Sequence, residues 1–84
     1  MVKLERGVKR RAYRSERRKT QARETRRAVI KAATRLFVER GYGLTTIDAI
    51  AESADVGRAT VFAAVGGKAA LLKAAYDVAL VGDD

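Results

Sequence analysis

The sequence predicts an all-α fold: a helix-turn-helix bundle of three helices, followed by the start of a fourth helix and preceded by a basic N-terminal arm. Two observations predict this fold. Apolar residues recur at helical spacing in separate segments, and glycine or aspartate stands where each of those segments would end. A chain of 84 residues has room for one small domain, which is marginally stable without a partner, a metal or a crosslink.

The first predicted helix covers residues 15–40, a stretch without proline or glycine. The residues that recur at helical spacing in its second half are Val29, Ala33, Leu36, Phe37 and Arg40. This spacing gives the helix an apolar stripe that should face the core. Gly41 follows the last turn and can adopt the left-handed conformation that caps a helix C-terminus.

The second predicted helix covers residues 46–54, with Thr45 as N-cap and Asp48 as its capping-box partner three residues later. Its expected buried face contains Ile47, Ile50, Ala51 and Ala54. Asp55 then lies at a sharp corner where the chain needs a positive φ, which Asp tolerates better than most residues.

The third predicted helix covers residues 58–65 and ends at Gly66-Gly67. We expect Val61 and Val65 to point inward and Ala59, Thr60, Ala63 and Ala64 to lie on the other side. The fourth helix begins at Lys68, with Leu71, Leu72, Ala75, Val78 and Ala79 inward. The large side chains assigned to the core are Phe37, Tyr42, Ile47, Ile50, Val61, Leu71 and Leu72.

Charge divides the chain into two parts. Residues 1–27 contain twelve Lys/Arg and three Glu, whereas residues 28–84 contain six Lys/Arg and seven Asp/Glu. A dense basic segment suits a polyanion, because each phosphate that it neutralises releases condensed counterions. The predicted organisation is a basic arm or helix extension at residues 1–24, the helix-turn-helix domain at residues 25–80, and the start of a linker at residues 81–84.

Composition argues against an enzyme. Cysteine and histidine are absent, which removes the usual zinc ligands and imidazole acid–base chemistry, so we expect no metal and no cofactor. There is no phosphate-binding glycine loop and no obvious carboxylate pair. The start of the chain lacks the apolar core of a signal peptide, and no apolar run reaches the about 18 residues of a membrane span. We therefore expect a cytoplasmic protein.

Residues 25–72 resemble the DNA-binding domain of TetR-family transcriptional regulators. Residues 32–42 (AATRLFVERGY) are similar to the end of the family's first helix, and residues 45–51 (TTIDAIA) to its second. Residues 56–62 (VGRATVF), with Gly66, Lys68 and Leu71-Leu72, are similar to its recognition helix and the start of its fourth helix. The resemblance implies sequence-specific binding of a double-stranded DNA operator, as a repressor that is nucleoid-associated when bound, with residues 58–65 in the major groove.

The chain departs from the family pattern in two ways. Gly57, Phe62 and Ala64 stand where the family usually has Ser, Tyr and His, and Val65 replaces a larger aromatic, so two phosphate contacts typical of the family lack their donors. Family members also continue into a larger helical domain that binds a small-molecule effector and forms the homodimer. We therefore expect a fragment or shortened product that binds no effector and dimerises only in the full-length protein.

The predicted recognition helix offers the residues for base contacts. Arg58 suits a bidentate pair with guanine, and Thr60 suits a base edge or a thymine methyl. Ala59 and Ala63 permit close approach and apolar contact with thymine. Two alternatives stay open: Arg58 can bind phosphate alone, and Phe62 lies either against the DNA or in the core.

The phosphate contacts are assigned to residues outside this helix. A cation at a helix N-terminus opposes the macrodipole, so Lys68 indicates a bound phosphate, with a solvated surface lysine as the alternative. Thr46 can meet a phosphate or serve only as a cap. Arg23, Arg26 and Arg27 of the arm can follow the backbone or enter a minor groove. The alternative for the arm is a solvated tail or helix extension, and alone we expect it to fluctuate.

Two other functions need only the basic arm. One is nonspecific nucleic-acid binding, including RNA, and the other is binding to anionic membranes. Both leave the capped second helix, the sharp corner and the small-residue face of the third helix without a role.

Overall fold

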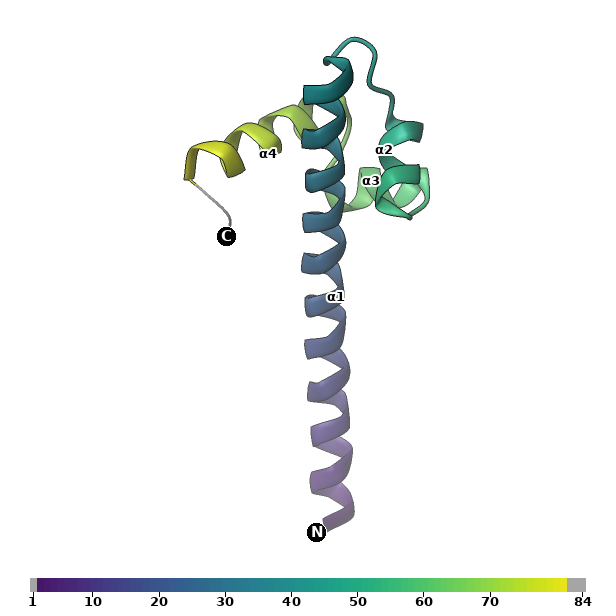
Figure 1. Cartoon of the computed structure of the whole chain (residues 1–84). Coiled ribbons are helices and arrows are strands. Elements are labelled where there is room, and N and C mark those ends of the chain that lie inside the picture. The colour runs from purple at the N-terminus through teal and green to yellow at the C-terminus, as the bar shows by residue number, and fades with distance from the viewer. Residues whose placement is uncertain (1, 82–84) are drawn as a thin grey trace.

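The computed structural model describes the backbone of residues 2–81 and the side chains of residues 16–80. Within that part of the chain there are four helices and no strand: α1 (Val2–Arg40), α2 (Ile47–Ala54), α3 (Arg58–Ala64) and α4 (Lys68–Val81). In Figure 1, α2, α3 and α4 gather around the C-terminal half of α1, and the rest of α1 projects away from them. The predicted all-α helix-turn-helix fold is confirmed. Of the expected linker at residues 81–84, Val81 is the last residue of α4, and the other three lie outside the described residues.

Helix α1 begins much earlier than predicted. We expected a start near Ser15, but the helical backbone begins at Val2. Residues 2–14 contain no proline, and most of them are residues with high helix propensity, so only Gly7 opposes the helix. The backbone of residues 2–24 is therefore a helix extension, while the side chains of its first cations, up to Arg14, lie outside the described residues.

The hydrophobic core lies between the C-terminal half of α1 and the other three helices. Its buried members are Val29, Ala32, Ala33, Leu36, Ile50, Ala51, Val61 and Leu71. Helix α1 contacts each of the other helices, and α2 also packs against α3. Burying each large apolar side chain contributes roughly 1.5–3 kcal/mol, so this cluster is the main source of stability.

The cap of α2 differs from our prediction by one residue. We assigned the N-cap to Thr45, but Thr46 has this role: its backbone is extended and its hydroxyl accepts a hydrogen bond of 3.1 Å from the amide of Ala49. The side chain of Thr45 is buried, with 1% exposed. Its hydroxyl lies 2.8 Å from the carbonyl oxygen of Gly41 and 3.1 Å from that of Leu36. The buried hydroxyl of Thr45 therefore ties the residue before α2 to the C-terminal end of α1.

The sharp turns lie where the sequence predicts them. Gly41 follows α1 with φ 84°, and its amide donates to the carbonyl of Phe37. Asp55 ends α2 in the left-handed conformation, with φ 58° and ψ 46°. Because a non-glycine residue pays a steric cost in this conformation, Asp55 marks the corner as a site of mild strain. Gly66, with φ 140°, separates α3 from α4.

Three residues assigned to the core are exposed instead. On α4, Leu72 is 38% exposed and Ala79 is also exposed. Around the helix axis, Leu72 lies about 100° and Ala79 about 80° from fully buried Leu71, so the apolar stripe is narrower than we predicted. Tyr42 is 42% exposed because it lies in the turn after α1, where its ring contacts Phe37 but is not enclosed by the core.

The remaining core predictions hold in part. Residues that pack against the core while only half-buried are Phe37, Ile47, Ala54 and Val65. Val65 is the C-cap of α3 rather than a residue inside the helix. Val78 of α4 is also half-buried.

Candidate nucleic-acid interface

Helix α3 presents a surface of small side chains. Val61 is fully buried and anchors the helix to the core, whereas Ala59, Thr60 and Ala63 are exposed. This division follows from the helical period, because residues two positions from Val61 point away from the core. The predicted outward face of α3 is confirmed, and Ala64 is half-buried at its edge.

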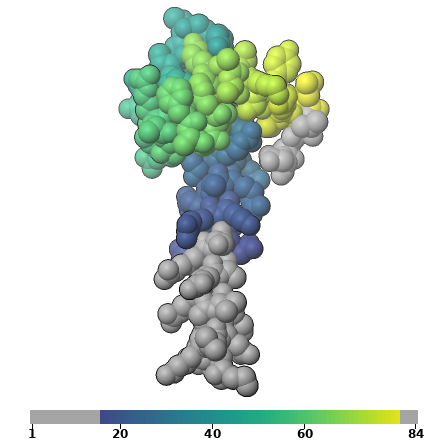
Figure 2. Space-filling model, turned by 180° about the vertical axis from the view of Figure 1, so that it is seen from behind, coloured from purple at the N-terminus to yellow at the C-terminus, as the bar shows by residue number. Residues whose placement is uncertain are grey.

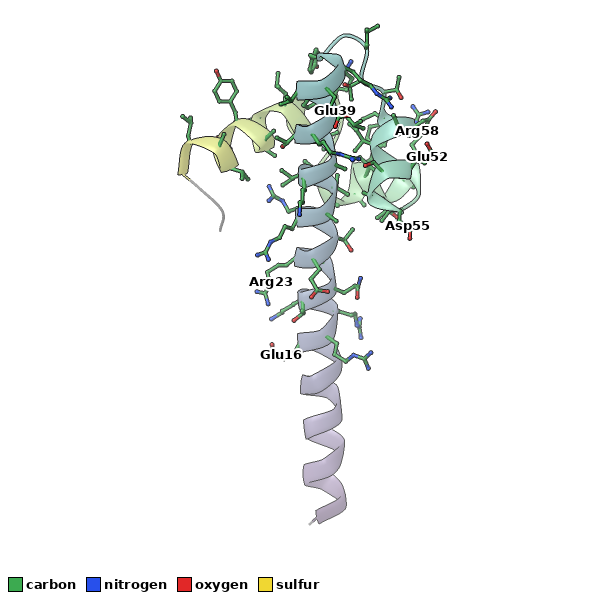
Figure 3. The ribbon with its side chains drawn as sticks, in the orientation of Figure 1. Glu16, Arg23, Glu39, Glu52, Asp55 and Arg58 are labelled. Atoms are coloured by element: carbon green, nitrogen blue, oxygen red, sulfur yellow. The ribbon has the colours of Figure 1, made fainter. Side chains whose placement is uncertain are left out.

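Arg58 begins α3 and makes two contacts. Its Nη1 lies 3.5 Å from Oδ1 of Asp48 in the first turn of α2. Its guanidinium also lies 5.8 Å from the ring centroid of Phe62, one turn further along α3. Figure 3 shows Arg58 at the outer edge of the α2–α3 pair, away from α1 in this view. Neither partner of Arg58 was expected from the sequence.

Phe62 lies at the surface, not in the core. Its side chain is 45% exposed, and its ring edge borders Gly67. Of the two positions left open by the sequence, the structure therefore excludes the interior. The ring adds an apolar surface beside the small residues of α3.

Part of the basic arm lies beside α3. The α1–α3 groove has a volume of about 430 Å³, and its lining residues are Ala22, Arg23, Thr25, Arg26, Thr60, Ala63 and Ala64. Seen from behind in Figure 2, the green surface of α2 and α3 adjoins the blue part of α1 where α1 leaves the bundle. The structure thus brings Arg23 and Arg26 to the exposed face of α3.

Arg27 does not line the α1–α3 groove but contributes to a second groove, on the α4 side of α1. The α1–α4 groove, of about 660 Å³, is lined by Arg23, Arg26, Arg27, Ile30, Lys31, Thr34, Arg35 and Val78. Sequence reasoning missed Lys31 and Arg35 as members of this basic surface, although Arg27, Lys31 and Arg35 follow one another at intervals of four residues. Arg35 also donates a hydrogen bond to the hydroxyl of Ser53 on α2. The three predicted arm arginines therefore do not form one cluster at α3.

Lys68 is the first residue of α4, as predicted. Its Nζ lies 4.3 Å from the ring centroid of Tyr42, and its side chain is half-buried. A cation over an aromatic face is stabilised by the ring quadrupole, so Tyr42 supports the ammonium group at this position. Thr46 is exposed at the start of α2, where its hydroxyl already accepts the capping bond and keeps its own proton free to donate.

Metal binding and membrane spanning find no support in the described part of the chain. No group of three or more His, Cys, Asp or Glu residues is placed there to hold a metal ion. None of its helices combines the length and the apolar character that crossing a membrane requires. The candidate site is the exposed small-residue face of α3 together with the basic residues that line the α1–α3 groove.

Comparisons with known proteins identify related sequences. The family model "Bacterial regulatory proteins, tetR family" matches residues 29–75, which is more than half of the chain. The chain is 43% identical over 59 residues to the HTH-type transcriptional regulator TtgR and, equally, to the probable HTH-type transcriptional regulator ArpR, both of Pseudomonas putida. The aligned part is 70% of this chain but 28% of each relative. No solved structure matches the chain.

Proposed function

Because the chain belongs to the TetR family of bacterial regulatory proteins, we propose that it binds an operator in double-stranded DNA sequence-specifically and represses transcription. In this proposal α3 enters the major groove. The observation that carries it is the exposed small-residue face of α3, with Ala59, Thr60 and Ala63 outward while Val61 fixes the helix to the core. Such a face permits the close approach that base contacts need. The family consists of regulators, and both relatives are named as regulators, not as enzymes.

The base contacts are proposed for the residues of α3 that reach outward. Arg58 has the donors for a guanine edge, and Thr60 has a hydroxyl and a methyl for a base edge or thymine. Ala59 and Ala63 supply apolar contact without blocking the helix. Phe62, which is partly exposed, extends this apolar surface toward a sugar or a thymine methyl.

The phosphate contacts are proposed for the ends of α2 and α4. Lys68 combines a side-chain ammonium with the unpaired amides of the first turn of α4, so a phosphate bound there would meet both. The hydroxyl of Thr46 can donate to a phosphate while it accepts the capping bond. These contacts would hold α3 in register without reading sequence.

The basic residues of α1 are proposed to follow the DNA beside α3. Arg23 and Arg26 line the α1–α3 groove, so phosphates that flank the groove occupied by α3 lie on their side of the molecule. Arg27, which lines the α1–α4 groove and not the α1–α3 groove, would reach a different phosphate or a neighbouring minor groove.

The wider biology is also proposed by analogy with the family. The chain spans less than a third of the length of the relatives that it matches. In a protein of that length, we expect homodimer formation and effector binding to fall to the remaining part, with residues 81–84 leading into it and residues 25–80 as the DNA-binding domain. A cytoplasmic location, at the nucleoid when DNA is bound, fits this role.

A selection experiment tests the proposal without knowledge of the operator. The protein is incubated with a pool of random duplexes, the bound duplexes are sequenced, and affinity is then measured for an enriched duplex, a random duplex and anionic vesicles at two salt concentrations. The proposal expects enrichment of a defined sequence and at least about tenfold tighter binding to it than to random DNA, a margin well within that of specific DNA-binding proteins. Equal affinity for random DNA, or preferential binding to vesicles, would contradict it.

A further inference from the structure

The contact between α2 and α3 through Asp48 and Arg58 is the starting point for a further inference. Asp48 is in the first turn of α2, and Arg58 is the first residue of α3. Their side chains are 73% and 64% exposed, and 3.5 Å separates the nearest oxygen and nitrogen. Phe62 borders the guanidinium from another side, 5.8 Å from its ring centroid. The guanidinium is thus directed by one carboxylate and one ring.

Stability explains this carboxylate only in part, through its favourable interaction with the macrodipole in the first turn of α2. Exposed ion pairs contribute little to folding, because water screens both charges. The N-terminus of α2 already has a cap in Thr46. On the surface proposed to meet DNA, a negative charge also repels phosphates. Asp48 therefore lowers general affinity for a polyanion, and a role in sequence reading would offset that loss.

We propose that Asp48 is a positioning residue that directs Arg58 to read a base and keeps it from binding phosphate. This inference rests on the proposed function. The pair uses Nη1 of the guanidinium, and the planar fork of arginine leaves other N–H donors for a bidentate contact. The O6 and N7 acceptors of guanine match such a contact. DNA binding would exclude water from the pair and strengthen the hold of Asp48 on Arg58.

The inference predicts opposite changes in the affinity for random duplex and in the preference for guanine. A simple charge effect would change the affinity for all duplexes together. Without the carboxylate, Arg58 can turn to the nearest phosphate, so affinity for random duplex should rise and its salt dependence should steepen by about one phosphate contact. The preference for guanine at the position read by Arg58 should fall at the same time. A good bidentate pair discriminates by roughly five- to more than a hundredfold, so a loss of about three- to tenfold is expected when only its orientation is lost.

Asp48→Asn is the test substitution, since it removes the charge and keeps the shape. Glu52→Gln is the matched control: Glu52 lies one turn later on α2, is also exposed, and its carboxylate has no hydrogen bond or ion pair within the described residues. Asp48→Glu serves as the conservative variant and should restore the preference at least in part. Arg58→Lys keeps the charge but lacks the fork, so it should also lose the guanine preference.

Each protein is first checked for wild-type helicity by circular dichroism and is then carried through selection from a random duplex pool. Affinities for the wild-type enriched duplex and for random duplex are measured over a salt series. We expect Asp48→Asn to bind random duplex more tightly, with a steeper salt dependence and weaker guanine selection, while Glu52→Gln keeps the wild-type sequence preference.

Two results distinguish failure of the proposed function from failure of the positioning role alone. If the wild-type protein selects no sequence, the proposed function itself is wrong and this inference falls with it. If the wild-type protein selects a sequence but Asp48→Asn selects it equally well, or changes affinity only as Glu52→Gln does, the positioning role alone is overturned.

Discussion

Replacing Thr45 with valine should destabilise the domain by about 1–3 kcal/mol, although the two side chains have nearly the same shape. Thr45 is 1% exposed, and its hydroxyl lies within hydrogen-bonding distance of the carbonyl oxygens of Gly41 and Leu36. Valine fills the same space, so no cavity adds to the effect. What is lost is the hydrogen bonding of a hydroxyl that is itself buried.

Thr34→Val is the matched control for this substitution. The hydroxyl of Thr34 donates to the carbonyl of Ile30 at 2.8 Å, but that carbonyl lies inside α1 and also serves the helical hydrogen-bond ladder. The side chain is only half-buried, so the control should change stability by no more than about 0.5 kcal/mol.

Thermal and urea unfolding followed by circular dichroism measure the difference. For a domain of this size, 1 kcal/mol corresponds to roughly 4–8 °C in Tm, so a loss of about 2 kcal/mol lowers Tm by roughly 8–16 °C. The urea midpoint should fall with an unchanged slope. Equal stabilities of Thr45→Val and Thr34→Val would refute the assignment of Thr45 as the buried polar link between α1 and α2.

Three further substitutions test the corner and the interface. Asp55→Gly should be more stable than Asp55→Ala by about 1 kcal/mol in urea unfolding, since glycine accepts the φ of 58° without a steric cost; equal midpoints would remove the claim of strain. Lys68→Ala should weaken binding to all duplexes and reduce the salt slope by about one, whereas Lys73→Ala on the same helix leaves the slope unchanged; an unaltered slope for Lys68→Ala would show that Lys68 binds no phosphate. Thr60→Val should change the sequence selected from a duplex pool with little effect on random-duplex affinity, and an identical selected sequence would exclude Thr60 from base contact.

Local chemistry explains why the centre of the fold was predictable. Gly41 and Asp55 determine where α1 and α2 end, because few residues accept positive φ at low cost. The choice between Thr45 and Thr46 as N-cap was not predictable in this way. Both hydroxyls can cap a helix, and only packing against α1 decides which of them points inward. The start of α1 was missed because we expected the arm, with its repelling like charges and few buried residues, to fluctuate, although most of its residues favour a helix.

The outward face of α3 was predictable from its period, but the contacts around it were not. Arg58 at the start of α3 forms an ion pair with Asp48 on α2, and Lys68 at the start of α4 lies over the ring of Tyr42, which precedes α2. The two members of each pair are not three or four residues apart on one helix, so helical periodicity could not predict their contact. Which arginines of α1 face the α1–α3 groove depends on how α1 is rotated about its axis relative to the bundle. This rotation is set by packing in three dimensions, so the position of Arg27 outside that groove could not be read from the sequence.

One continuous helix carries both Arg26 and the fully buried Val29. Each residue turns an α-helix by about 100° and advances it by about 1.5 Å, so the direction of the upstream cations is set by counting back from Val29. A single uncharged residue inserted between these two positions would rotate Arg23 and Arg26 by about 100° relative to α3 while leaving the net charge unchanged. Within this segment, therefore, insertions and deletions should be tolerated less well than exchanges of one basic residue for another.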